Sequence, residues 1–120
     1  MNGKYRGKDI KTGKWVYGWF CIWQGISLIF DSPFNLYNNP VEVIPESVGQ
    51  WIGPKDKNGV DAYAGDIIDD KEFGIMRLTW CDLELCFAGY DKLDSFTRAS
   101  AFSNPTIIGN TTDNPELLKD

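Results

Sequence analysis

The densest group of residues that could do chemistry is a run of four carboxylates, Asp66, Asp69, Asp70 and Glu72. Oxygen ligands at these spacings could bind Mg²⁺ or Ca²⁺, and carboxylates can also supply acid–base catalysis. A calcium-binding loop, however, needs a regular alternation of ligands that this run lacks. We interpret the run as a solvated turn and predict no bound metal and no cofactor.

Histidine is absent from the chain, which excludes a Ser-His-Asp triad, a Cys-His pair and any histidine metal site. The three cysteines, Cys21, Cys81 and Cys86, are an odd number and lie in or beside apolar runs. Zinc would need ligands beyond Cys81 and Cys86 that the sequence does not supply nearby. We therefore predict free, mostly buried thiols, no catalytic residues and a protein that is not an enzyme.

Charge is distributed unevenly along the chain, whose net charge is −5. Residues 1–14 carry a local charge of +4, so the remainder of the chain carries −9. Lys4, Arg6 and Lys8 are spaced by two, which places them on one face of a strand as a basic stripe. The stripe could contact phosphates or the acidic half of a neighbouring copy. Because an acidic body opposes the approach of a polyanion, nucleic-acid binding by a small barrel is only the alternative hypothesis.

Aromatic residues make up 14% of the chain and include five tryptophans. Residues 14–23 alternate with aromatic side chains on one face and aliphatic or aromatic side chains on the other, so this strand is expected to be sandwiched or to lie at an interface. We predict that Trp15, Trp19, Trp51 and Trp80 fill the core. The aromatic residues left to reach solvent as interaction residues are Trp23, Phe34 and Tyr37.

Helical periodicity is almost absent, whereas short alternating runs and turn signals recur, which favours a β-rich fold. In the first half, strands are predicted at residues 4–10, 14–23 and 26–30, as an antiparallel meander. Residues 31–40 are rich in Asn and Pro and are expected to form a loop. Pro45 to Val48 is predicted to form one helical turn, because proline is favoured at the first helical position.

In the second half, Lys55 to Gly59 is a polar turn whose Asn-Gly step tolerates positive φ. Gly65-Asp66 is a second turn before Ile67 and Ile68, which suit a buried strand. Residues 91–103 are expected to be a polar excursion. The remaining predicted elements are a closing strand at 106–108 and a capped helical turn at 114–118.

A hairpin is predicted between residues 76 and 87. A two-residue loop at Cys81-Asp82 pairs Trp80 with Leu83, Leu78 with Leu85 and Met76 with Phe87. An odd loop would place Trp80 and Leu83 on opposite faces, so the loop has two or four residues. Cys-Asp is poor chemistry for a two-residue turn, which leaves four as an open alternative.

Residues 49–68 carry the pattern Gly, aromatic, then Lys55-Asp56-Lys57-Asn58-Gly59, then Tyr63-Ala64-Gly65-Asp66-Ile67, which resembles the YopX family of phage and prophage proteins. The opening at Tyr5–Lys8 and Gly13–Gly18 and the ending at Asn114–Leu118 are also similar to the family, whereas residues 21–40 and 91–103 carry no matching motif. The resemblance implies a small SH3-like barrel and supplies no catalytic residues to carry over.

These observations predict a mainly β protein that forms a single unit over residues 1–120. Its expected parts are an N-terminal meander over 1–48, packed on a small SH3-like barrel over 49–118, with short helical turns only. The polar N-terminus and the lack of a long apolar run predict no membrane segment and a location in the bacterial cytoplasm. The expected function is that of a phage-derived accessory protein that acts by protein–protein association, including self-association. The candidate interaction residues are Lys4, Arg6, Lys8, Trp23, Phe34 and Tyr37.

Overall fold

A computed structural model describes residues 4–31 and 40–119 of the chain. The protein is mainly β, with two antiparallel sheets, and the described residues contain no helix of seven or more residues. The predicted fold class is therefore confirmed. The chain divides into two compact units, an N-terminal unit of Met1–Trp51 and a C-terminal unit of Ile52–Asp120.

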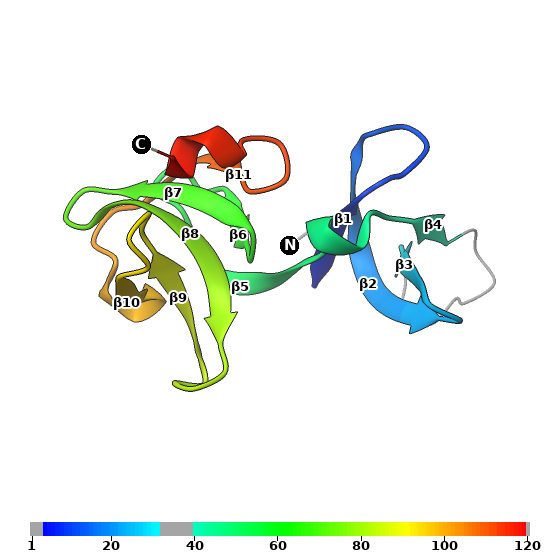
Figure 1. Ribbon diagram of the computed structural model, residues 1–120, viewed down its shortest axis with the longest axis horizontal. Helices are drawn as coiled ribbons and strands as arrows, with labels where there is room; N and C mark the ends of the chain where they lie inside the picture. Colours follow the sequence, from blue (N-terminus) through cyan, green and yellow to red (C-terminus); the bar gives the residue numbers. More distant parts are fainter. Residues whose placement is uncertain (1–3, 32–39, 120) are drawn as a thin grey trace. The chain divides into compact units, whose positions relative to one another are not determined.

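The N-terminal unit is the predicted meander (Figure 1). Its strands are β1 (Tyr5–Lys8), β2 (Trp15–Trp23), β3 (Ile26–Phe30) and β4 (Val41–Glu42), in the sheet order β4-β3-β2-β1, and η1 (Pro45–Ser47) is the predicted helical turn. Strand β5 (Gly49–Lys55) pairs with β1 at its start and continues into the C-terminal unit. Val43 and Ile29 are buried in this unit. Gly7 packs closely against Val43, because a Cβ atom on Gly7 would lie only 2.8 Å from Val43 Cγ2.

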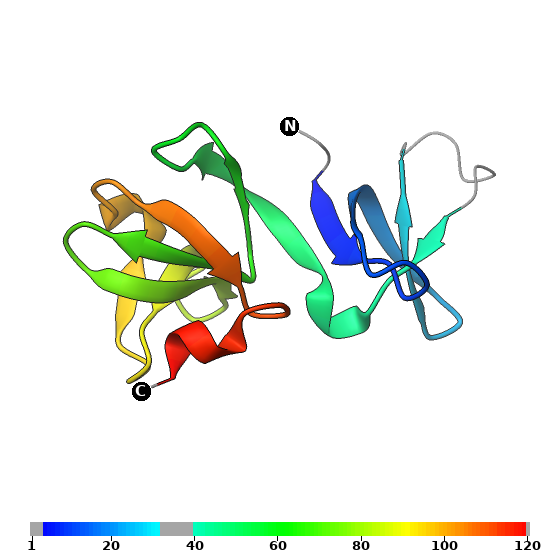
Figure 2. The same cartoon turned by 90° about the horizontal axis from the view of Figure 1, so that it is seen from above.

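The C-terminal unit is built on five strands in the order β10-β9-β8-β7-β11 (Figures 1 and 2). The meander β7 (Asp66–Asp70), β8 (Gly74–Cys81), β9 (Cys86–Tyr90) and β10 (Phe96–Arg98) is followed by the short η2 (Ala99–Ala101). Strand β11 (Thr106–Asn110) then returns to pair with β7, the connectivity expected of a small SH3-like barrel. The remaining elements are β6 (Asp61–Tyr63), which pairs with β5, and η3 (Pro115–Leu118).

The core of the C-terminal unit lies on β7 and β8. Ile67 and Ile68 are fully buried although they project to opposite faces of β7, as expected for a strand covered on both sides. Ala62, Met76 and Leu78 complete a cluster around Ile68, and Ile52, Phe102 and Ile107 pack against it. The prediction of a buried strand after Gly65-Asp66 is confirmed.

The β8–β9 hairpin has a four-residue loop, Asp82–Leu85, so the even loop length is confirmed. Trp80 lies opposite Phe87 and Cys81 opposite Cys86. The pairs expected from a two-residue loop are therefore wrong, because Leu83 and Leu85 belong to the loop. Both leucines are exposed, with 95% and 75% of their surface accessible, and the loop projects away from the other strands of its unit (Figure 1).

Two further sequence predictions need correction. Residues 91–103 are not only a polar excursion, since they contain β10 and η2, and β10 pairs with β9 as an edge strand. A three-residue strand is too short to show an alternating pattern, which is why the sequence missed it. The helical turn η3 forms as predicted, but Asn114 does not cap it: its Oδ1 accepts a hydrogen bond from the backbone N–H of Asn110.

Candidate functional site

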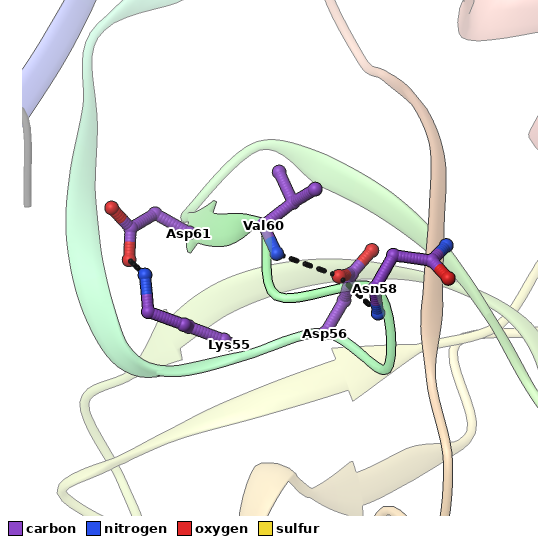
Figure 3. Close-up of polar contacts among 5 residues, drawn as sticks. All are labelled: Lys55, Asp56, Asn58, Val60 and Asp61. Carbon is purple, nitrogen blue, oxygen red and sulfur yellow. Dashed lines mark hydrogen bonds and ion pairs between the residues drawn. The ribbon is translucent and has the colours of Figure 1, made fainter.

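The polar turn between β5 and β6 is organised by the carboxylate of Asp56 (Figure 3). Its Oδ1 accepts hydrogen bonds from the backbone N–H groups of Asn58 and Val60, both at 2.9 Å. Gly59 has φ +80°, as the Asn-Gly step predicts. On the outer side of the turn, Lys55 and Asp61 form an ion pair at 3.0 Å.

Asp56 also fastens this turn to a distant part of the chain. Its Oδ2 accepts a hydrogen bond of 3.1 Å from the backbone N–H of Ile107, in β11. Only 8% of the Asp56 surface is exposed, so both carboxylate oxygens are directed to backbone donors and away from solvent. The carboxylate therefore acts as a structural anchor that joins the β5–β6 turn to the last strand.

An apolar pocket of about 140 Å³ lies beside this anchor. Its walls include Ile68, Leu78, Phe102 and Ile107, and Asp56 lies at its edge. A dry cavity of about 150 Å³ is large enough for a molecule the size of benzene. The pocket is therefore suited to a single small apolar group.

The predicted run of carboxylates does not form one solvated turn. Asp66 and Asp70 are almost fully buried, at 2% and 1% exposure, whereas Asp69 and Glu72 are exposed. Side chains alternate along β7, so Asp66 and Asp70 lie on the same face as the buried Ile68, whereas Asp69 lies on the other face. Within the described residues no group of three or more Asp, Glu, Cys or His side chains is placed to hold a metal ion.

The buried carboxylates Asp70 and Asp66 both accept hydrogen bonds from backbone N–H groups. Asp70 Oδ2 accepts from the backbone N–H groups of Glu72 (3.0 Å) and Phe73 (3.1 Å), and its Oδ1 accepts from those of Ser103 (3.0 Å) and Asn104 (3.2 Å). Asp66 Oδ2 accepts from the backbone N–H of Tyr63 at 2.8 Å. Asp56 and Asp70 both begin a turn and accept the N–H two residues on, which is the pattern of an Asx-turn.

These contacts change the acidity of both anchors. Burial raises the pKa of Asp70, but the four backbone N–H donors outweigh it and bring the pKa below its ordinary value of 3.8. Burial likewise raises the pKa of Asp56, and the N–H groups of Val60, Ile107 and Asn58 lower it below the same value. In each case the ionised form is the one that the fold stabilises.

We predict that the free energy of unfolding is constant from about pH 7 to pH 5 and falls steeply below about pH 4. A carboxyl whose folded pKa is depressed contributes stability above its unfolded pKa and loses it as the pH falls through the folded value. Urea unfolding at a series of pH values measures this effect. The fall should be shallower in Asp70→Ala, and equal profiles for that variant and the wild type would contradict the assignment.

The basic stripe is only partly exposed. Lys4 is exposed and Lys8 is half-buried, but Arg6 is buried at 7% exposure, with its guanidinium 4.7 Å from the centre of the Trp15 ring. Regular spacing alone could not show this, because Arg6 is covered by the aromatic side chains that β2 places beside it. Of the three residues in the stripe, only Lys4 and Lys8 are therefore accessible to a nucleic acid.

The aromatic predictions have a mixed outcome. Trp23 is exposed at 58%, while Phe34 and Tyr37 lie outside the described residues. The prediction that four tryptophans fill the core is wrong: Trp15, Trp19 and Trp51 are half-buried and Trp80 is 44% exposed. Aliphatic residues, Tyr63 and Phe30 are the large buried side chains instead.

Residues 4–119 match a family model described as YopX protein. No curated protein matches the chain. In the described residues, no helix is long and apolar enough to cross a membrane.

Proposed function

Because this chain belongs to the YopX protein family, we propose that it is a phage-derived accessory protein without enzymatic activity, which works in the bacterial cytoplasm by binding proteins, including copies of itself. The observation that carries the proposal is an open apolar face on the N-terminal sheet. We call it the aromatic face. It consists of Trp15, Tyr17, Trp19, Cys21 and Trp23 of β2 and of Ile26 and Leu28 of β3.

The strand register brings these side chains together. Directly paired residues project to the same side of a sheet, and Trp23 is paired with Ile26 and Cys21 with Leu28. None of the seven residues is buried, and Tyr17 and Trp23 are 37% and 58% exposed. A sheet with one solvated face normally alternates apolar with polar residues, so this face is suited to being covered by another protein.

A groove of about 530 Å³ runs along one end of the aromatic face. Its apolar lining residues include Trp23, Ile26, Leu28, Ile10 and Val41. Its charged lining residues are Asp9, Lys11 and Glu42. An apolar floor with a charged rim is the composition of a protein interface, in which tryptophan is the residue type that most often contributes strongly to binding.

Charge complementarity favours a second copy of the chain as one partner. Lys8, which is half-buried, is paired with Trp15 and therefore lies beside the aromatic face, in a segment whose local charge is +4. The remainder of the same chain carries −9. Opposite charges on two copies would attract each other and set their orientation on association.

We predict that Trp23→Ser weakens self-association at least tenfold, because it removes the most exposed tryptophan of the face. Light scattering over a range of concentrations should give a mass above 13.6 kDa for the wild type and a shift toward the monomer for the variant. Trp80→Ser is the matched control, since Trp80 is 44% exposed but belongs to the C-terminal unit. A wild type that stays monomeric at all concentrations, or equal effects of the two substitutions, would reject the proposal.

A further inference from the structure

Two thiols face each other at the end of the β8–β9 hairpin. Cys81 and Cys86 are the last paired residues before the four-residue loop, and both are free. In an antiparallel pair the Cα atoms of such residues are about 4.5 or 5.5 Å apart, and both side chains project to the same side. Disulfides form at Cα separations of about 4.4–6.8 Å, so the spacing of a directly paired Cys81 and Cys86 falls in the range that a disulfide needs.

Both sulfur atoms have polar neighbours. Arg98 Nη1 donates a hydrogen bond to Cys86 Sγ at 3.8 Å, and the same guanidinium is held by Glu84 through an ion pair of 2.7 Å. The nearby Tyr90 hydroxyl, with the N–H groups of Glu84 and Leu83, lowers the pKa of Cys81 below its ordinary value of 9.0. The thiolate is the nucleophile in disulfide exchange, so the lowered pKa of Cys81 favours its reaction.

We propose that Cys81 and Cys86 are a reversible dithiol–disulfide pair, oxidised by a low-molecular-weight disulfide of the glutathione type. Cys86 is the more exposed of the two, so it is the thiol that an oxidant in solution reaches first, while Cys81 is only 8% exposed and reacts second. We assign no part to Cys21, which belongs to the N-terminal unit and has no place in this hairpin.

The exchange has two steps. The Cys86 thiolate attacks one sulfur of glutathione disulfide, which forms a mixed disulfide and releases one glutathione thiolate. The Cys81 thiolate then attacks Cys86 Sγ, which forms the Cys81–Cys86 bond and releases the second glutathione. Two electrons pass from the protein to glutathione disulfide, and the two thiol protons end on the two glutathione molecules.

Oxidation would close a covalent ring at the base of the loop that exposes Leu83 and Leu85. Leu85 has φ +52°, a backbone conformation that leucine rarely adopts, and the bond would hold the loop in it. In a reducing cytoplasm the pair is expected to be in the dithiol form, and an oxidising change would close it. The pair is thus a redox-sensitive covalent link at the base of an exposed apolar loop.

The test is to equilibrate the full chain in glutathione buffers of increasing oxidation, quench with acid, and alkylate the remaining thiols under denaturing conditions. Alkylatable thiols should fall from three to one, and the mass before alkylation should fall by that of two hydrogen atoms. Peptide mapping should place the bond between Cys81 and Cys86. Three thiols remaining at the most oxidising ratio, a bond to Cys21 or a bond between two chains would each overturn the proposal.

Three cysteine variants test which thiol reacts first and whether Cys21 is involved. Cys81→Ser should stop at the mixed disulfide, with one glutathione on Cys86, whereas Cys86→Ser should acquire none at Cys81. Cys21→Ser is the matched control and should form the bond as the wild type does. Equal addition of glutathione to the Cys81→Ser and Cys86→Ser variants would overturn the assigned order of attack, and circular dichroism of each variant before oxidation shows that the fold is intact.

Discussion

Replacing Asp70 with alanine is expected to lower the free energy of unfolding by about 4 kcal/mol, because one buried carboxylate serves four backbone N–H groups. Two donors lie in the turn after β7, at Glu72 and Phe73, and two lie at Ser103 and Asn104. Without the carboxylate, which is itself only 1% exposed, these four donors lose a charged acceptor. Urea unfolding monitored by tryptophan fluorescence measures the loss.

The matched control for this substitution is the preceding residue. Asp69 is on the same strand and carries the same side chain, but it is exposed, so Asp69→Ala should change the free energy of unfolding by less than about 0.5 kcal/mol. Asp70→Asn keeps the volume and one acceptor oxygen, and its loss should lie between those of the two alanine variants. A loss below about 1 kcal/mol in Asp70→Ala would show that the four contacts are not maintained in solution.

Replacing Asp56 with alanine is expected to cost about 3 kcal/mol. Its three backbone donors are one fewer than those of Asp70, and two of them, Asn58 and Val60, lie within the same turn. The third, at Ile107, joins the turn to β11, so the variant should also lose protection of the Ile107 amide against hydrogen exchange. Chemical unfolding and amide exchange together measure both effects.

Lys57→Ala is the control for Asp56, since Lys57 lies in the same turn with an exposed side chain. Its backbone N–H donates to the carbonyl of Pro105 at 3.0 Å, and the substitution leaves that bond in place. Its stability should therefore stay within about 0.5 kcal/mol of the wild type. Equal losses in the Asp56 and Lys57 variants would mean that disturbance of the turn, and not the carboxylate, causes the effect.

The two anchors, Asp56 and Asp70, give the Lys55–Gly59 motif a structural role. Asp70 holds the chain at Ser103 and Asn104, and Asp56 holds it at Ile107, so both fix the segment that leads into β11. That strand pairs with β7 and brings the end of the five-stranded sheet back to its beginning. The motif is therefore architectural: it positions a closing strand through hydrogen bonds between residues far apart in sequence.

Local patterns were sufficient for much of the fold. Alternation in residues 14–23 predicted β2, the Asn-Gly step predicted the positive φ of Gly59, and the spacing of apolar residues predicted an even loop in the β8–β9 hairpin. Each of these features depends on the geometry of a few neighbouring residues, namely side-chain period, turn conformation and pairing parity. Such information is contained in a short stretch of sequence.

The roles of individual side chains could not be deduced in the same way. Asp56 and Asp70 look like ordinary turn residues until β11 and the segment before it supply their donors from 51 and from 33 to 34 residues away. Cys81 and Cys86 became partners only when the hairpin took its four-residue loop.

The positions of strands and turns, and the family, could thus be predicted from the sequence. Burial of the anchoring carboxylates and exposure of the tryptophans were decided by the tertiary fold, because each depends on which distant backbone or side chain comes to lie beside it.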